Sequence, residues 1–189
     1  MLRLGLIALC LLLCTPAFAD ALSRRLLVNG DSLAVGTKPY IPRELDGWKV
    51  THSAAVGRRA HEGVDVMRSY GRKLPRVIHV SLGTNDDPSQ VEGFRAVIEE
   101  VMEVAGARRC VVWTNIVRPP YKGTSYDAYN RELRRADRER ANLRVVNWVR
   151  MVARNPEWLA EDGVHASRAG YRARAKAVAR EVRRCRTSA

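Results

Sequence analysis

Aromatic residues are scarce in this 189-residue sequence: they make up 6% of it, and only two are phenylalanines. Proteins that bind single-stranded nucleic acid commonly place aromatic side chains among their basic residues. Here the few aromatics do not interleave with the arginines, and no docking motif accompanies them. We therefore expect no nucleic-acid partner.

Long apolar runs are absent after the first twenty residues, and so are internal repeats and low-complexity linkers. The one apolar run, LGLIALCLLLC, follows Arg3, precedes AFA and Asp20, and is too short to span a bilayer. This is the order of a secretory signal peptide. We predict a signal peptide over 1–19, cleaved after Ala19, and a single secreted or extracytoplasmic domain over 20–189. An uncleaved anchor is the alternative.

Cysteine is rare outside this segment. Cys10 and Cys14 leave with the predicted signal peptide, so only Cys110 and Cys185 remain. Lipidation of Cys14 is a further alternative, although Leu13 stands where a small residue is expected. An oxidising compartment would let Cys110 and Cys185 pair, and the other reading is two unpaired cysteines. Sequence does not give the distance between them.

Acidic residues are few compared with basic ones: the sequence has 20 acidic and 33 basic residues and a formal net charge of +13. Removing Arg3 with the signal peptide leaves +12. The basic residues are densest over 131–144 and 168–186. We interpret them as solvated helix faces, with a weak, salt-sensitive attraction to anionic envelope polymers or lipid head groups. We expect a monomer.

Five short runs rich in Val and Ile predict strands: RLLVNG, WKVTHSA, RVIHVSLG, RCVVWTNIV and LRVVNW. Amphipathic spacing over 91–106 and 125–141 predicts helices between the later strands, and the tail predicts a final helix capped by Ser167. Strands that are almost continuously apolar and alternate with helices indicate a parallel sheet covered on both faces. The predicted fold is a three-layer α/β/α domain with a flavodoxin-like, five-stranded parallel sheet.

Five residues with catalytic potential follow the carboxyl ends of these strands, where such sheets bind ligands. Ser32 follows the first strand, Gly57 the second and Asn85 the third, while Asp162 and His165 lie in the loop before the last helix. Taken alone, each of these residues can be explained as part of a turn or as a helix cap. Those readings do not explain why all five lie on one rim of the sheet.

Acyl transfer from an ester needs a nucleophile, a base, a group that orients the base, and hydrogen-bond donors for the oxyanion. Ser32, His165 and Asp162 provide the first three. The backbone N–H groups of Ser32 and Gly57 and the Asn85 side chain provide the donors. The DGVH segment could also be half of a metal site, but no second cluster of His and carboxylates accompanies it. We expect neither a metal nor a cofactor.

These motifs resemble the SGNH (GDSL) hydrolase family, through GDSL at 30–33, the glycine at Gly57, GTND at 83–86 and DGVH at 162–165. Gly63 is the competing candidate for the second-block glycine. The second half is similar to the SGNH domains found outside the membrane in bacterial cell-envelope O-acetyltransferases. Asn147 stands where that pattern has Asp, which we interpret as a structural position. If this chain transfers acetyl groups, we expect another protein or a soluble donor to supply them.

The resemblance implies an exported serine esterase that removes short acyl groups, above all O-acetyl, from carbohydrate or cell-envelope glycan. One alternative is an O-acetyltransferase that passes the acyl group to a glycan hydroxyl. An alternative of another class is an inactive glycan-binding envelope protein.

Several secondary residues have weaker claims to the site. His79 is expected in the core, and Trp158 is expected to brace the catalytic loop. A place on the site rim is the minority reading for His61, which follows the Gly57 loop. Asp86 and Asp87 are expected to cap a helix beginning near Pro88.

Overall fold

A parallel sheet of five strands forms the centre of the protein, in the order β2-β1-β3-β4-β5. The computed structural model describes residues 24–185, so the predicted signal peptide and Cys14 lie outside the described residues. The strands, each within one of the five apolar runs, are β1 (Arg25–Gly30), β2 (Lys49–Ala54), β3 (Val77–Ser81), β4 (Cys110–Thr114) and β5 (Leu143–Val146). The predicted three-layer parallel fold is confirmed.

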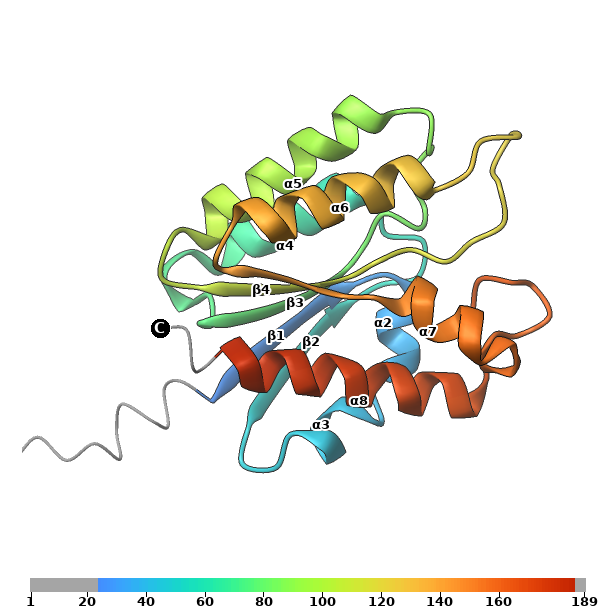
Figure 1. The fold of residues 1–189 in the computed structure, drawn as a ribbon. Coiled ribbons are helices and arrows are strands. Elements are labelled where there is room, and N and C mark those ends of the chain that lie inside the picture. Colours follow the sequence, from blue (N-terminus) through green and yellow to red (C-terminus); the bar gives the residue numbers. More distant parts are fainter. Residues whose placement is uncertain (1–23, 186–189) are drawn as a thin grey trace, which may run out of the picture.

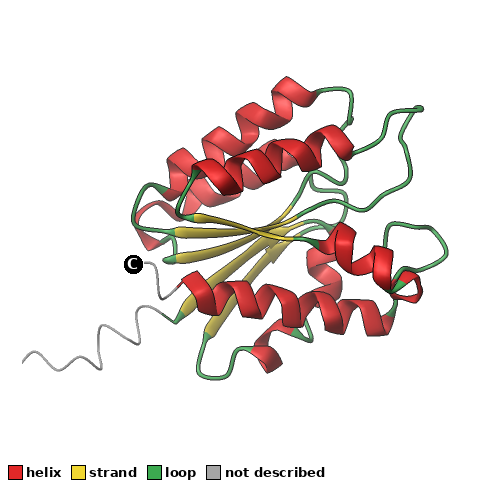
Figure 2. Ribbon diagram, viewed as in Figure 1, coloured by secondary structure: helices red, strands yellow, loops and turns green. Residues whose placement is uncertain are grey.

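Helices cover both faces of the sheet (Figures 1 and 2). One layer holds α4 (Ala60–Tyr70), α5 (Val91–Ala105) and α6 (Asp127–Glu139). The other holds α2 (Ser32–Thr37), α3 (Ile41–Glu44) and α8 (Arg168–Arg184), with α7 (Trp148–Arg154) beside the end of α8. Short 3₁₀ turns lie at Gly71–Lys73 and Pro156–Trp158. Among residues 24–185, no helix combines the length and apolar character needed to cross a membrane.

The sheet reverses its winding direction at β1, because β2 is added on one side of it and β3 on the other. Gly30, the last residue of β1, is in register with Ala54 on β2 and with Ser81 on β3. In open α/β sheets a crevice forms outside the carboxyl ends of the strands at such a switch point. Ser32 lies two residues beyond Gly30, so the topology carries it to this crevice.

Two apolar clusters fill the space between the sheet and its helix layers. Trp113 and Trp148 are both buried in the interior, as expected of tryptophans near strands. The Trp113 indole N–H donates to the carbonyl oxygen of Leu82. The two buried tryptophans therefore anchor β4 and α7 in the core.

Some helices depart from the sequence prediction. The helices α3, α4 and α7 lie where the spacing of apolar residues predicted none, and all are short or interrupted by polar positions. The helix expected near Pro88 begins at Val91. Asp86 instead accepts the backbone N–H of Ala60, at the start of α4, and Asp87 accepts that of Ser89 in the preceding turn. Ser167 caps α8 as predicted.

A disulfide joins Cys110, at the start of β4, to Cys185, directly after α8, with the Cα atoms 5.8 Å apart. Cys185 is buried against the α8 layer. The bond ties the last helix to an inner strand at the amino end of the sheet, opposite the crevice.

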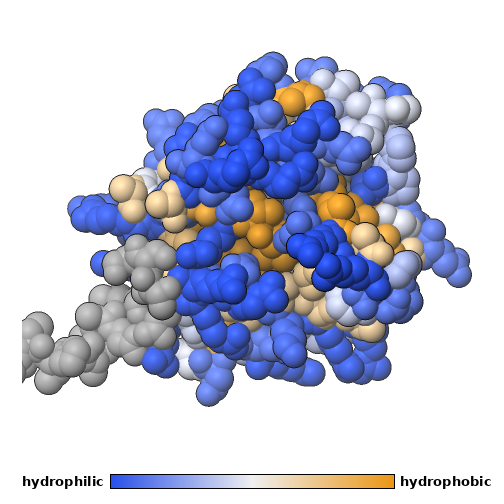
Figure 3. Space-filling view, in the orientation of Figure 1, coloured by the Kyte–Doolittle hydropathy of each residue, from blue (hydrophilic) through white to orange (hydrophobic). Residues whose placement is uncertain are grey.

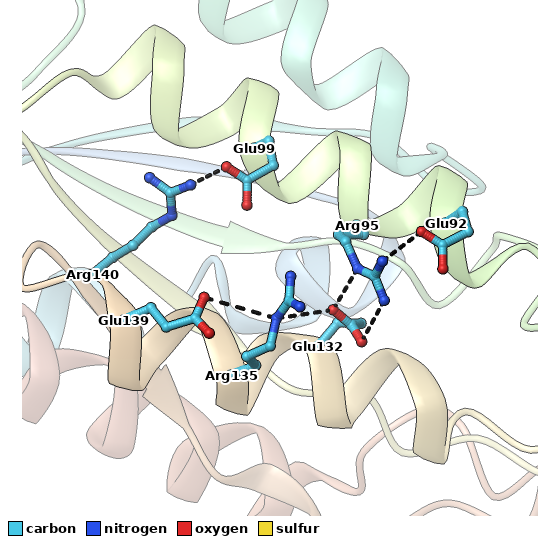
Figure 4. A network of polar contacts seen from close by, with 7 residues as sticks. All are labelled: Glu92, Arg95, Glu99, Glu132, Arg135, Glu139 and Arg140. Atoms are coloured by element: carbon cyan, nitrogen blue, oxygen red, sulfur yellow. Dashed lines mark hydrogen bonds and ion pairs between the residues drawn. The ribbon is translucent and has the colours of Figure 1, made fainter.

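Charged side chains cover the outer faces of the helices, and apolar side chains show between the two layers (Figure 3). Arginines of the basic 131–144 segment are partly neutralised by glutamates of α5 and α6 (Figure 4). This network comprises Glu92, Arg95, Glu99, Glu132, Arg135, Glu139 and Arg140. Exposed ion pairs of this kind contribute little stability one by one. The segment is therefore less free to attract polyanions than its composition suggests.

Candidate active site

Ser32 is the first residue of α2 and follows β1 through a single residue, Asp31. The buried Asp31 carboxylate accepts the backbone N–H of Leu33, 2.9 Å away, and caps the helix. The N–H of Ser32 is left without a partner among residues 24–185, as expected at a helix start. The turn thus presents both the hydroxyl and the N–H of Ser32 at the carboxyl edge of the sheet.

His165 and Asp162 complete a hydrogen-bonded chain to Ser32. The Ser32 Oγ lies 3.0 Å from His165 Nε2, and His165 Nδ1 lies 2.6 Å from Asp162 Oδ2. A carboxylate only accepts hydrogen bonds, so Nδ1 carries the proton and Nε2 is free to accept the serine proton. Residues 133 positions apart in sequence meet here.

Asp162 is held as a charged group. Its hydrogen bond with the His165 ring, together with backbone N–H donors from Val164 and His165, lowers the pKa of Asp162 to about 2. The side chains of His165 and Asp162 are 44% and 50% exposed. Solvent and substrate can therefore reach the imidazole, while the carboxylate fixes its tautomer and orientation.

The loop that carries this pair is braced by the preceding 3₁₀ turn, as predicted for Trp158. The N–H of Ala160 donates to the carbonyl of His165, and that of Ser167 donates to the carbonyl of Trp158. The Trp158 ring stacks on buried Trp148 at 6.1 Å between centroids. These contacts fix the loop to the core and so limit the movement of the imidazole.

The glycines of the second block have different roles. Gly57 is exposed, has φ +77°, a backbone conformation that favours glycine, and its N–H has no partner within the described chain. Gly63 is buried inside α4, its N–H donates to Arg59, and a Cβ there would lie 2.1 Å from the Leu82 side chain. Gly57 is therefore the residue with an N–H free for an oxyanion.

Asn85 follows β3 and is oriented by the Gly57 loop. One side-chain N–H of Asn85 donates to the carbonyl of Arg58 at 3.2 Å, which leaves the second for a substrate oxygen. The Arg58 guanidinium in turn donates to the carbonyls of Gly30 and Ser53, at the ends of β1 and β2. Arg58 links the nucleophile turn to both candidate oxyanion donors, a role that local sequence patterns do not reveal.

A buried arginine lies behind the nucleophile turn. Arg174 of α8 is 1% exposed, and its Nη2 donates to Ser81 Oγ at 3.0 Å. Burial raises the pKa of Asp31, and the Arg174 charge opposes that rise. Burial also lowers the pKa of Arg174 to about 10. Arg174 lies in the basic tail that sequence analysis assigned to a solvated face, and that assignment is wrong for this residue.

Within residues 24–185, none of the other histidines hydrogen-bonds to Ser32. His79 is fully buried in β3, bonded through Nε2 to Thr114 Oγ1 at 2.9 Å, and burial lowers its pKa to about 3. His52 lies on β2. His61 is exposed at the start of α4 and lines a cavity next to Asn85. Asn147 caps α7 by accepting the Arg150 N–H, a structural position as interpreted from the sequence.

Comparison with known proteins assigns the chain to a family. Residues 17–173 match the family model described as "GDSL-like Lipase/Acylhydrolase family". The chain belongs to this family. It is thus an SGNH-type enzyme domain, and the resemblance stated from the motifs is confirmed.

Individual relatives are distant. O-acetyltransferase OatA of Staphylococcus aureus (strain NCTC 8325 / PS 47) is 25% identical over 151 residues, 78% of this chain. The chain spans only 23% of that relative's length. The C-terminal catalytic domain of Streptococcus pneumoniae peptidoglycan O-acetyltransferase A has a TM-score of 0.68 at 17% identity, covering 87% of this chain and 93% of that one. A GDSL-like lipase from Bacteroides thetaiotaomicron has a TM-score of 0.70 at 16% identity, covering 89% and 96%.

Proposed function

We propose that the protein is an exported serine esterase that removes short acyl groups, above all O-acetyl, from carbohydrate or cell-envelope glycan. The observation that carries the proposal is the chain from Ser32 Oγ through His165 to the Asp162 carboxylate. Membership of an acylhydrolase family supports the reaction class. The O-acetyltransferase names of the relatives support acetyl as the group and the cell envelope as the location.

In the first half-reaction, His165 Nε2 takes the Ser32 proton as Oγ bonds to the ester carbonyl carbon. The resulting oxyanion accepts hydrogen bonds from the N–H groups of Ser32 and Gly57 and from the Asn85 amide. Each such donor is worth roughly 3–4 kcal/mol of transition-state stabilisation. Collapse of the intermediate breaks the ester C–O bond, and the His165 proton goes to the leaving sugar oxygen.

In the second half-reaction, a water molecule gives its proton to His165 and attacks the acyl-Ser32 carbonyl. Acetate leaves, and Ser32 recovers its proton from the imidazole. The charged Asp162 stabilises the imidazolium that forms in each half. The proposed steps are carried by side chains and backbone N–H groups alone.

The second candidate function is acyl transfer, in which a sugar hydroxyl replaces water at the acyl-enzyme. The relatives named O-acetyltransferase favour it. Both functions share the acyl-Ser32 intermediate, so the acceptor decides the outcome. Incubation with p-nitrophenyl acetate, with and without an acceptor glycan, separates the two. Acetate release that is independent of acceptor supports the esterase, and acetylated glycan formed with little hydrolysis supports the transferase.

An inactive glycan-binding protein is the alternative of another class. A hydrogen-bonded Ser-His-Asp chain has no evident use in a protein that only binds. Ser32→Ala is expected to abolish ester turnover and leave the melting temperature nearly unchanged, since Ser32 is a half-buried surface residue. A wild-type protein that turns over no acetyl ester would support the binding function instead.

A further inference from the structure

A cavity of about 590 Å³ lies next to Asn85, and the mechanism above leaves it unused. Its walls come from the start of α4, the loop over 85–90, the start of α5, and the segment from Arg118 to Tyr129. Ser32 and His165 do not line it. Its volume falls in the range of small-molecule sites, roughly 300–1,000 Å³.

The lining of the cavity combines charged and amide side chains with aromatic and aliphatic ones. Charged and amide groups come from Arg118, Lys122, Asp87 and Gln90. An aromatic ring comes from Tyr121, a residue that is 40% exposed. An alkyl chain would leave the charged groups of this wall unpaired, because it strips water from them and offers neither donors nor acceptors. A sugar ring offers hydroxyls to the polar groups and a C–H face to an aromatic ring.

The wall is already held in place by hydrogen bonds. The Tyr126 hydroxyl donates to the carbonyl of Asp86 at 3.0 Å, and the Tyr129 hydroxyl donates to that of Asp87 at 2.6 Å. The Arg118 guanidinium donates to the carbonyl of Thr84, directly before Asn85. These bonds fix the loop that carries Asn85 to the cavity wall, so a ligand seated in the cavity is aligned with the oxyanion donor.

Tyr121 sits on a tight hairpin. Tyr121 and Thr124 exchange two backbone hydrogen bonds of 3.0 Å, and the two residues between them, Lys122 and Gly123, have φ values of +50° and +78°. The Lys122 ammonium lies 5.2 Å from the centre of the Tyr121 ring. The hairpin holds Tyr121, a residue of the cavity lining, on a backbone with little freedom left to lose on binding.

From these observations we propose that the cavity is the subsite for the sugar portion of the acyl ester, with Tyr121 as a specificity-determining residue. This assignment rests on the proposed function, because it names where the glycan of that reaction lies. The carbonyl oxygen meets Asn85 at the edge of the cavity, and the neighbouring ring extends toward Tyr121, Gln90 and Asp87.

Gly93 of α5 offers a direct test, because it lines the cavity and faces open space. A Cβ built there meets only Gln90 Cβ, at 3.9 Å. The Cβ of Gly93→Leu therefore fits without a clash, the larger side chain adds bulk at the cavity lining, and the substitution replaces a poor helix former. Gly93→Ala is the matched control, with the same backbone change and little bulk.

The assay compares an O-acetylated peptidoglycan oligosaccharide with ethyl acetate, whose alcohol is too small to need the cavity. Gly93→Leu is expected to lower kcat/KM for the glycan ester at least tenfold and to change that for ethyl acetate less than twofold. Gly93→Ala is expected to stay within threefold on both. Tyr121→Ala is expected to lower kcat/KM for the glycan ester about five- to tenfold, and Tyr121→Phe, which keeps the ring, less than twofold.

The results distinguish failure of the subsite assignment from failure of the proposed function. If the glycan ester is deacetylated equally well by wild type, Gly93→Leu and Tyr121→Ala, the cavity assignment is overturned while the proposed function stands. Equal losses on both esters overturn the assignment as well. If the wild-type protein hydrolyses ethyl acetate but not the glycan ester, the proposed carbohydrate substrate is wrong, and the subsite assignment falls with it.

Discussion

The disulfide between Cys110 and Cys185 is expected to stabilise the fold strongly without supporting catalysis. It closes a loop with a sequence separation of 75 residues. Chain entropy lost by the unfolded state for a loop of that length corresponds to about 4.5 kcal/mol. For a protein of this size, that predicts a drop in melting temperature of about 9–18 °C when the bond is removed.

The same geometry predicts an unchanged kcat. Cys110 opens β4, a strand of five residues, whereas the catalytic residues follow the opposite, carboxyl ends of the strands. At about 3.3 Å per residue the strand separates the two ends by roughly 16 Å. The double variant Cys110→Ala, Cys185→Ala should therefore hydrolyse p-nitrophenyl acetate at the wild-type rate at temperatures well below its own melting point.

The assay pairs thermal melts with initial rates for the oxidised protein, the thiol-reduced protein and the double alanine variant. The reduced protein controls for the loss of sulfur packing that the alanines introduce. Coincident melts of oxidised and reduced protein would refute the stabilising role. A fall in kcat in the fully folded variant would refute the separation of the bond from the site.

Three further predictions concern buried or charged groups. Because the pKa of Asp162 is about 2, this carboxylate should stay ionised down to about pH 3, so its own protonation should not shape the pH–rate profile above that pH. Asp162→Asn should lower kcat by roughly 10⁴-fold, measured with p-nitrophenyl acetate. The buried His79 has a pKa lowered from 6.5 to about 3, so the unfolded state binds a proton below pH 6.5 that the folded state refuses. The contribution of His79 to the free energy of unfolding should therefore be fully present above pH 6.5. The free energy of unfolding, measured with urea, should fall by about 2 kcal/mol between pH 7 and pH 5, and His79→Leu should flatten that slope. Arg174→Met should lower the free energy of unfolding by about 3–5 kcal/mol, because it leaves the buried Asp31 charge uncompensated. Adding Asp31→Asn to that variant should recover part of the loss, and additive losses in urea unfolding would contradict the coupling.

The fold was accessible from sequence because its strands are short, apolar and regularly separated by helices. The five predicted runs contain the five strands, and the Gly and Ser residues that end α5 and begin α8 mark those helices correctly. Short helices such as α3 and α7 could not be predicted, because four or seven residues carry too little periodicity and form only through packing.

The motifs also located the residues that the structure brings together, since parallel strand ends converge on one edge. What they missed lies in contacts over long sequence separations. The sequence pattern predicts that Arg174 is one more surface arginine in a basic tail, but the structure buries it behind the Ser32 turn. The sequence pattern predicts that Asp86 caps the helix that follows it, but its carboxylate accepts the N–H of Ala60 at the start of α4, 26 residues earlier. Neither partner can be inferred without the three-dimensional arrangement.

The most direct test of the central claim is the site of covalent labelling by a serine-directed organophosphonate, mapped by peptide mass spectrometry. A nucleophile activated by His165 should carry a single adduct, on the peptide containing Ser32. The adduct should disappear in Ser32→Ala and form far more slowly in His165→Ala. An adduct on another serine, or labelling of Ser32 at an unchanged rate without His165, would contradict the mechanism.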